Sequence, residues 1–155
     1  MAHSFTGIYL HIIFSTKNRM RMLSPDLRDR LFPYIGGLIR ERNGDALLIN
    51  GVEDHIHILT KFPATITLSD FLRDIKSISA GWVHDMFSDA RQFGWQTGYA
   101  AFSVSKSNVD AVRDYVARQE EHHKHKTFEE EYLDFLNRHG IEYDPRFVFE
   151  KEIAG

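Results

Sequence analysis

The chain has 155 residues, which suits one domain, and we expect residues 1–155 to fold as a single domain. It contains no cysteine, and this excludes disulfides, thiolate chemistry and cysteine-ligated zinc sites. The net charge of −3 does not by itself indicate a nucleic-acid-binding protein, although the N-terminal third is basic and the C-terminal end is acidic. Because no segment resembles a signal peptide or a membrane span, we expect a cytoplasmic protein.

Hydrophobic periodicity and capping residues predict an alternation of strands and helices along the chain. The predicted order is strand 5–16, helix 24–43, strand 46–52, strand 55–62, helix 69–86, strand 99–105, helix 107–124 and helix 127–139, followed by an extended tail. Ser24, Ser69 and Thr127 are the expected N-caps of three of the helices, and Gly140 is the expected residue beyond the last one.

The first six of these elements have the order β-α-β-β-α-β, which is typical of a split βαβ arrangement. We therefore predict an α+β, ferredoxin-like (RRM-like) fold, in which an antiparallel sheet carries helices on one face. The core would span residues 5–124 approximately. It includes the helix 107–124, which together with the last helix is added to the six-element unit. The last helix, 127–139, opens a markedly acidic extension over about 127–155, whose preferred role is contact with another subunit.

The pair His55 and His57 carries the main chemical interest. In a strand, residues i and i+2 face the same side, so both imidazoles project together, about 7 Å apart at Cα, and can bind one metal ion. Asp54 could orient one of these imidazoles through a hydrogen bond. The alternative is a pair of surface histidines on a solvated sheet face. His11, on another strand, is a possible third ligand.

Tyr115 and Gln119 are four residues apart in the predicted helix 107–124, so they lie on one helical face. In that arrangement Tyr115 could act as a nucleophile, with Gln119 as a neutral oxygen ligand beside it. The alternative is a tyrosine packed at the helix edge next to a solvent-facing glutamine. The histidines at 122, 123 and 125 indicate a solvated helix end.

Together these features resemble the single-tyrosine HUH transposases of small bacterial insertion sequences and their repeat-associated relatives. The resemblance rests on five segments in order, and these are 9–19, 54–59, 93–99, 102–105 and 119–123. It covers nearly the whole chain, with His55-Ile56-His57 at the metal motif and Tyr115 with Gln119 on the later helix.

The resemblance implies an enzyme that cuts and rejoins single-stranded DNA marked by hairpins, through a 5′-phosphotyrosine formed on Tyr115. It implies a divalent ion, Mg²⁺ or Mn²⁺, bound by His55, His57 and Gln119, and a homodimer. Neither the base that accepts the proton of Tyr115 nor the choice between a site built within one chain and one shared between two chains is predicted.

DNA contacts are expected from two groups of basic residues. Lys17, Arg19 and Arg21 form a compact cationic connection after the first strand. Lys61, Arg73 and Lys76 lie after the histidine strand and on the next helix. Each of these side chains could instead be an ordinary solvated surface charge.

Two other functions remain open at this stage. One is a non-catalytic single-stranded nucleic-acid-binding regulator derived from a transposase, which would not need Tyr115. The other is a metal-dependent phosphoesterase that uses His55 and His57 to activate water.

Overall fold

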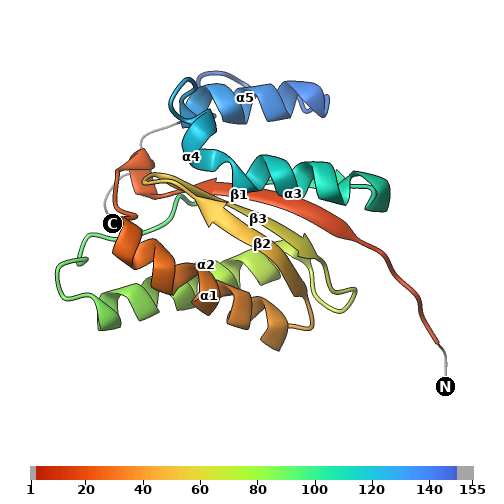
Figure 1. Cartoon of the computed structure of the whole chain (residues 1–155), viewed down its shortest axis with the longest axis horizontal. Coiled ribbons are helices and arrows are strands. Elements are labelled where there is room, and N and C mark those ends of the chain that lie inside the picture. The colour runs from red at the N-terminus through yellow and green to blue at the C-terminus, as the bar shows by residue number, and fades with distance from the viewer. Residues whose placement is uncertain (1–2, 150–155) are drawn as a thin grey trace.

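The computed structural model describes residues 3–149, and within them a four-stranded sheet is surrounded by helices (Figure 1). The elements are β1 (Tyr9–Ser15), the 3₁₀ turn η1 (Lys17–Arg19), α1 (Pro25–Glu41), β2 (Asp45–Gly51), β3 (His55–Lys61), α2 (Leu68–Met86), β4 (Ala100–Val104), the 3₁₀ turn η2 (Lys106–Asn108), α3 (Val109–Ala117), α4 (Gln119–His122) and α5 (Phe128–Arg138).

The sheet has the strand order β2-β3-β1-β4 with every neighbouring pair antiparallel. This is the topology predicted from the order of the elements, and the ferredoxin-like α+β fold is confirmed. The two central strands, β1 and β3, pair with Ser15 opposite His55 and Ile13 opposite His57. The histidine pair therefore lies in the middle of the sheet, at the end of β3 that adjoins η1.

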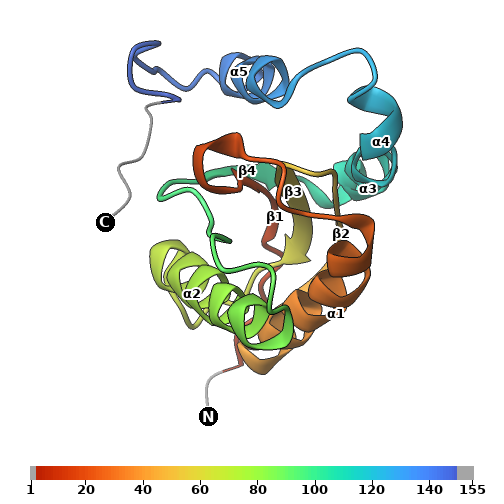
Figure 2. The ribbon, with the colours of Figure 1, turned by 90° about the vertical axis from the view of Figure 1, so that its left-hand side faces the viewer.

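The two faces of the sheet carry different helices. Figure 2 shows α1 and α2 on one side of the strands and α3, α4 and α5 on the other. Ile56 and Ile58 join the main core under α1 and α2. A second, smaller core on the other face packs the α5 side chains Phe128, Tyr132 and Leu136 against Ile13 and Phe102 of the sheet, with further side chains around them. The histidines of β3 point to this second face because they alternate with Ile56 and Ile58.

The helix caps follow the sequence closely, with one exception. The side chain of Ser24 accepts a hydrogen bond from the backbone N–H of Leu27, and Thr127 forms a capping box with Glu130 before α5. Gly140, with φ of 63°, follows α5 as predicted. The predicted cap Ser69 is wrong, because Thr67 caps α2 by accepting from the N–H of Asp70.

The prediction of one continuous helix over 107–124 is also wrong. It is broken at Arg118, whose backbone (φ −102°, ψ 27°) leaves the helical region and separates α3 from α4. The amide of Asn50 on β2 donates to the carbonyl oxygens of Val116 (2.9 Å) and Ala117 (3.3 Å). These carbonyls would otherwise accept from the next helical turn, so the contact with β2 stabilises the break.

Across residues 3–149, no helix is long and apolar enough to cross a membrane.

Candidate functional site

The site begins with the local structure that holds His55 and His57. Gly51 ends β2 where the chain turns toward β3, and a Cβ there would collide with the backbone carbonyl of His55. Both imidazoles are fully buried beneath α4 and α5, so the alternative of two surface histidines is wrong. The strand therefore presents two ring nitrogens to an enclosed space rather than to solvent.

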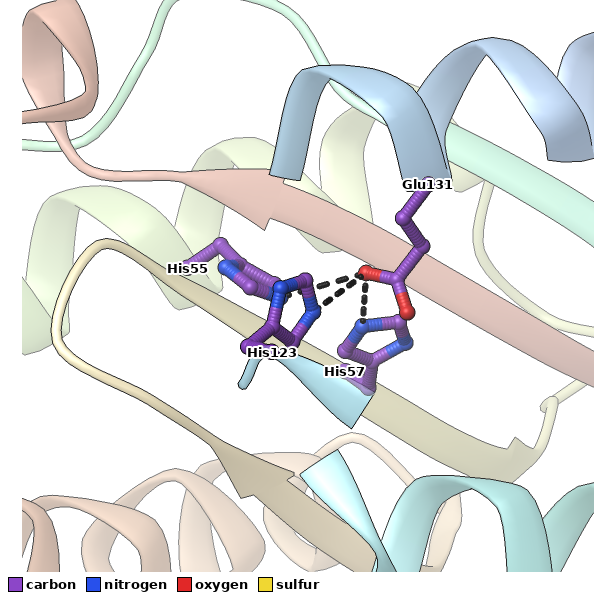
Figure 3. A group of neighbouring side chains, drawn as sticks. All are labelled: His55, His57, His123 and Glu131. Carbon is purple, nitrogen blue, oxygen red and sulfur yellow. Dashed lines mark hydrogen bonds and ion pairs between the residues drawn. The ribbon is translucent and has the colours of Figure 1, made fainter. Parts of the chain in front are cut away.

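A carboxylate from α5 occupies the centre of that space (Figure 3). Glu131 Oε1 lies 3.2 Å from His55 Nε2 and 3.0 Å from His57 Nε2. It also lies 3.0 Å from Nε2 of His123, which directly follows α4. Three imidazoles from two different segments thus converge on one oxygen atom.

Gln119 joins the same cluster from the start of α4. Its Oε1 lies 3.2 Å from His55 Nε2 and 3.1 Å from His123 Nε2, and its amide donates to Glu131 Oε2 over 3.4 Å. The break at Arg118 does not prevent the predicted proximity of Gln119 to Tyr115, because both side chains contact Glu131.

Tyr115 on α3 turns its hydroxyl into the cluster. The hydroxyl donates to Glu131 Oε2, and the ring lies 6.0 Å from that of His57 and 4.5 Å from that of His122, measured between centroids. The phenol and the paired histidines belong to the same chain.

The charges of the two strand histidines differ. Burial alone would lower the pKa of His55, but its hydrogen bonds to Asp54 (2.7 Å from Nδ1) and Glu131 outweigh this and raise the pKa to about 9. Burial lowers the pKa of His57 to about 4, and the neighbouring His55 and His123 act in the same direction while Glu131 opposes them. The carboxylates beside His55 therefore favour its charged form, whereas burial favours the neutral form of His57.

The acids respond to the same surroundings. Burial would raise the pKa of Glu131, but hydrogen bonds from His123, His55 and His57 hold it far below its ordinary value. Burial, together with the charge of Glu131 and its hydrogen bond, raises the pKa of Tyr115 well above the ordinary range for a phenol. The site as it stands thus holds an ionised carboxylate beside a protonated phenol.

His11 lies behind the cluster rather than in it. Its Nε2 is 2.7 Å from His57 Nδ1, and its ring stacks on that of His57 with centroids 5.0 Å apart. One of the two nitrogens must donate to the other. His11 therefore fixes the orientation of His57 and leaves Nε2 of His57 facing Glu131. The sequence had suggested His11 as a third metal ligand, but its Nε2 contacts His57 instead of joining the cluster.

The donor atoms fit a divalent metal ion. One ligand atom from each of His55, His57, His123 and Glu131 can be chosen so that all four lie within 4.8 Å of one another. Imidazole nitrogen and carboxylate oxygen are ordinary ligands of divalent transition metals. Asp54 bonds the far nitrogen of His55, as a partner that orients a ligand does.

Two residues of this cluster were missed in the sequence. His123 had been assigned to a solvated helix end, and this is wrong because its side chain is 10% exposed and contacts Glu131. Glu131 was one of several acids in the extension. The four-residue spacing of Gln119 and His123 was a usable indication for His123. For Glu131 the indication was its place on the apolar helical stripe of Phe128, Tyr132 and Phe135, whereas Glu130 belongs to the capping box.

The basic residues fall into two groups in space. Lys17 and Arg19 form η1, which adjoins the His55 end of β3 because Thr16 donates its N–H to the carbonyl of Asp54. The guanidinium of Arg19 lies over the ring of Phe149 at 5.2 Å, and Arg21 pairs with Glu53 at 3.4 Å. This group lies beside the site, and its contact with DNA stays a prediction.

The second group lies away from the histidines. Lys61 is at the opposite end of β3 from His55, and α2 covers the other face of the sheet. Arg73 on α2 pairs with Asp70 and Asp74. Lys76 donates to the carbonyl of Gln96 (2.9 Å). The structure does not bring these three cations to the cluster.

Comparison with known proteins identifies the chain at this point. The model of the family described as "Transposase IS200 like" matches residues 4–119. The chain belongs to the IS200-like transposase family. It is 28% identical over 130 residues to the transposase for insertion sequence element IS200 of Salmonella typhimurium LT2, covering 80% of this chain and 84% of that protein. The counterpart from Salmonella typhi gives the same values.

Solved structures agree on the fold of this IS200-like chain. A Deinococcus radiodurans R1 protein described as a transposase has a TM-score of 0.60 at 18% identity, over 77% of this chain and 96% of that one. A REP-associated tyrosine transposase bound to a REP hairpin has a TM-score of 0.51 at 15% identity, over 75% of this chain and 66% of that one. The resemblance inferred from the sequence motifs is confirmed at the level of family and fold.

Proposed function

We propose that this chain cuts and rejoins single-stranded DNA, with Tyr115 as the nucleophile and with His55 and His57 as ligands of a divalent ion. The observation that carries the proposal is the placement of the Tyr115 phenol and the two imidazoles around one buried cluster, within one chain of an IS200-like transposase. A phenol packed at a helix edge for structural reasons would not need to face metal-ligating groups.

The chemical step is a transesterification. The oxygen of Tyr115 forms a bond to the scissile phosphorus while the bond from phosphorus to the 3′ oxygen breaks. This gives a 5′-phosphotyrosine and a free 3′-OH, with the phenol proton released and a proton gained by the leaving oxygen. A later 3′-OH reverses the step on another strand, so no ATP is consumed.

The ion expected from the family resemblance is Mg²⁺ or Mn²⁺. When bound, it would offset the negative charge that develops on the phosphate oxygens and align the phosphate with the nucleophile. His55, His57 and His123 would supply nitrogen ligands, and Gln119 would supply a neutral oxygen beside them. Because Mg²⁺ prefers oxygen ligands and imidazole suits transition metals, the third imidazole favours Mn²⁺.

The proposed substrate is single-stranded DNA that carries hairpins. Its support is the relative of known structure that is bound to a REP hairpin, and the cationic group Lys17, Arg19 and Arg21 beside the site. The homodimer implied by the family resemblance stays a prediction. The contacts described here do not require it, because Tyr115 and the histidines come from one chain.

A labelled single-stranded hairpin incubated with the protein and Mn²⁺ tests the proposal. We expect a covalent protein–DNA adduct that survives denaturant and is lost in Tyr115→Phe, which removes only the hydroxyl. Tyr143→Phe, which removes a phenol hydroxyl from the tail beyond α5, is the matched control and should retain the adduct.

The other outcomes identify the alternatives. Hairpin binding without any adduct would support the silent regulator, and our proposal would then be wrong. Free cleaved DNA with unmodified protein, equally produced by Tyr115→Phe, would support a metal-dependent phosphoesterase.

A further inference from the structure

Glu131 contacts both halves of the site through different oxygens. Its Oε1 lies among the Nε2 atoms of His55, His57 and His123 at 3.0–3.2 Å. Its Oε2 accepts the hydroxyl of Tyr115. The described structure thus joins the metal-ligating cluster and the phenol through a single carboxylate.

This carboxylate lies beyond the part of the chain that the family model matches. The family match ends at residue 119, whereas Glu131 lies on α5, in the acidic extension. The helix is fixed by the capping box at Thr127 and by Phe128, Tyr132 and Leu136, which pack on the sheet. The cap at the start of α5 and the packing of its apolar side chains on the sheet together hold Glu131 over the histidines.

The burial of Glu131 needs an explanation that packing does not give. Its side chain is 2% exposed, and an ionised carboxylate is costly to remove from water unless it is paired. The other buried residues of the same helix, Phe128, Tyr132 and Leu136, are hydrophobic. An apolar residue would serve equally well at 131 if α5 only covered the sheet.

We propose that Glu131 bridges the metal site and the nucleophile, an inference that rests on the proposed function. One oxygen binds the divalent ion with the histidines, and the other holds the hydroxyl of Tyr115 beside it. Without this hydrogen bond, a phenol on a half-exposed helix face would sample several rotamers. The bond keeps the hydroxyl beside the reacting phosphate, in the orientation that the attack requires. The extension is on this basis a working part of the site rather than a surface for another subunit.

Glu131→Gln in the full chain tests the bridge, because it keeps the size of the side chain and removes its charge. Glu129→Gln removes the same charge two positions earlier on α5 and is the matched control. We expect the affinity for Mn²⁺, measured by calorimetry without DNA, to fall at least about tenfold in Glu131→Gln and to stay nearly unchanged in the control.

Single-turnover formation of the DNA adduct supplies the second measurement. In Glu131→Gln we expect the rate at saturating hairpin to fall at least about tenfold, with the hairpin concentration for half-maximal rate nearly unchanged, because the nucleophile is misplaced while DNA contacts persist. Glu131→Asp keeps the charge but is one methylene shorter. It should bind Mn²⁺ more tightly than Glu131→Gln while adduct formation stays slow.

Several results would overturn the bridge. Unchanged Mn²⁺ binding in Glu131→Gln would mean that the carboxylate is not a ligand of the ion. Tighter Mn²⁺ binding or faster adduct formation would mean that it blocks the site instead. If Glu131→Gln does not fold, Glu131→Asp replaces it in the test. The bridge would then be contradicted if Glu131→Asp had the same Mn²⁺ affinity and the same adduct rate as the parent protein. Failure of the proposed function is distinct, because the parent protein would then form no adduct while the calorimetric comparison still reports on Glu131.

Discussion

His57 uses its two ring nitrogens for different purposes. Nδ1 contacts His11 on the neighbouring strand, and Nε2 faces Glu131 and the proposed ion. The same division applies to His55, whose Nδ1 bonds Asp54. A ligand imidazole whose other nitrogen is bonded cannot rotate freely, so these second partners determine where the donor atoms lie.

Replacing His11 with alanine should therefore weaken metal binding without removing a ligand. We expect the Mn²⁺ affinity to fall about 10–100-fold, and the free energy of unfolding to fall by about 1–3 kcal/mol because a buried nitrogen of His57 loses its partner. Calorimetry and urea unfolding measure the two effects. His3→Ala, at an exposed position, is the control, and an unchanged Mn²⁺ affinity in His11→Ala would show that His57 needs no orienting partner.

Single residues of the site were predictable only where local periodicity placed them. The alternation of His55, Ile56 and His57 is a property of one strand, and it correctly gave a shared face. Glu131 contacts His57 across 74 residues of chain, and its neighbours Glu129 and Glu130 are the same residue type. Helical spacing places Glu131 on the apolar stripe of α5, but its contact with a strand so distant in the chain does not follow from local sequence.

At the scale of elements, the break between α3 and α4 determines how the tyrosine helix meets the site. The sequence 107–124 has no proline or glycine, so its periodicity predicted one helix. The break depends on Asn50, 66 residues before Val116, and such a long-range hydrogen bond leaves no trace in local periodicity. The predicted sheet order needed no such contact, because it follows from the sequence of strands and helices alone.

Asn50→Ala should destabilise this junction. It leaves the carbonyls of Val116 and Ala117 without the amide donor, and we expect a loss of about 1–2 kcal/mol in the free energy of unfolding. Urea unfolding measures it. The control is Asn108→Ala, since the exposed side chain of Asn108 makes no capping hydrogen bond to α3, and it should stay within about 0.5 kcal/mol of the parent. An equal loss in both variants would contradict the role of Asn50.

For the whole molecule, the arrangement of two cores on one sheet has a functional meaning. The larger core, under α1 and α2, stabilises the strands, and the smaller one docks α5 on the face that carries the histidines. The cluster of His55, His57, His123 and Glu131 joins the sheet to this second layer of helices, which Figure 2 shows on one side of the strands. Binding of an ion there would add to the contacts of Gln119 and Glu131 that already join β3 to α4 and α5.

Mn²⁺ should accordingly protect the second layer more than the first. With free Mn²⁺ at about 100 times its dissociation constant, the folded state gains about 2.7 kcal/mol if the unfolded chain does not bind the ion. Local opening that releases a ligand loses this stabilisation, so amide exchange should slow in β3, in 119–123 and in α5, and should change little in α2. Hydrogen exchange followed by mass spectrometry measures each segment. In Glu131→Gln the protection of α5 should disappear while that of 119–123 is partly kept, and protection confined to β3 in the parent protein would show that the second layer does not bind the ion.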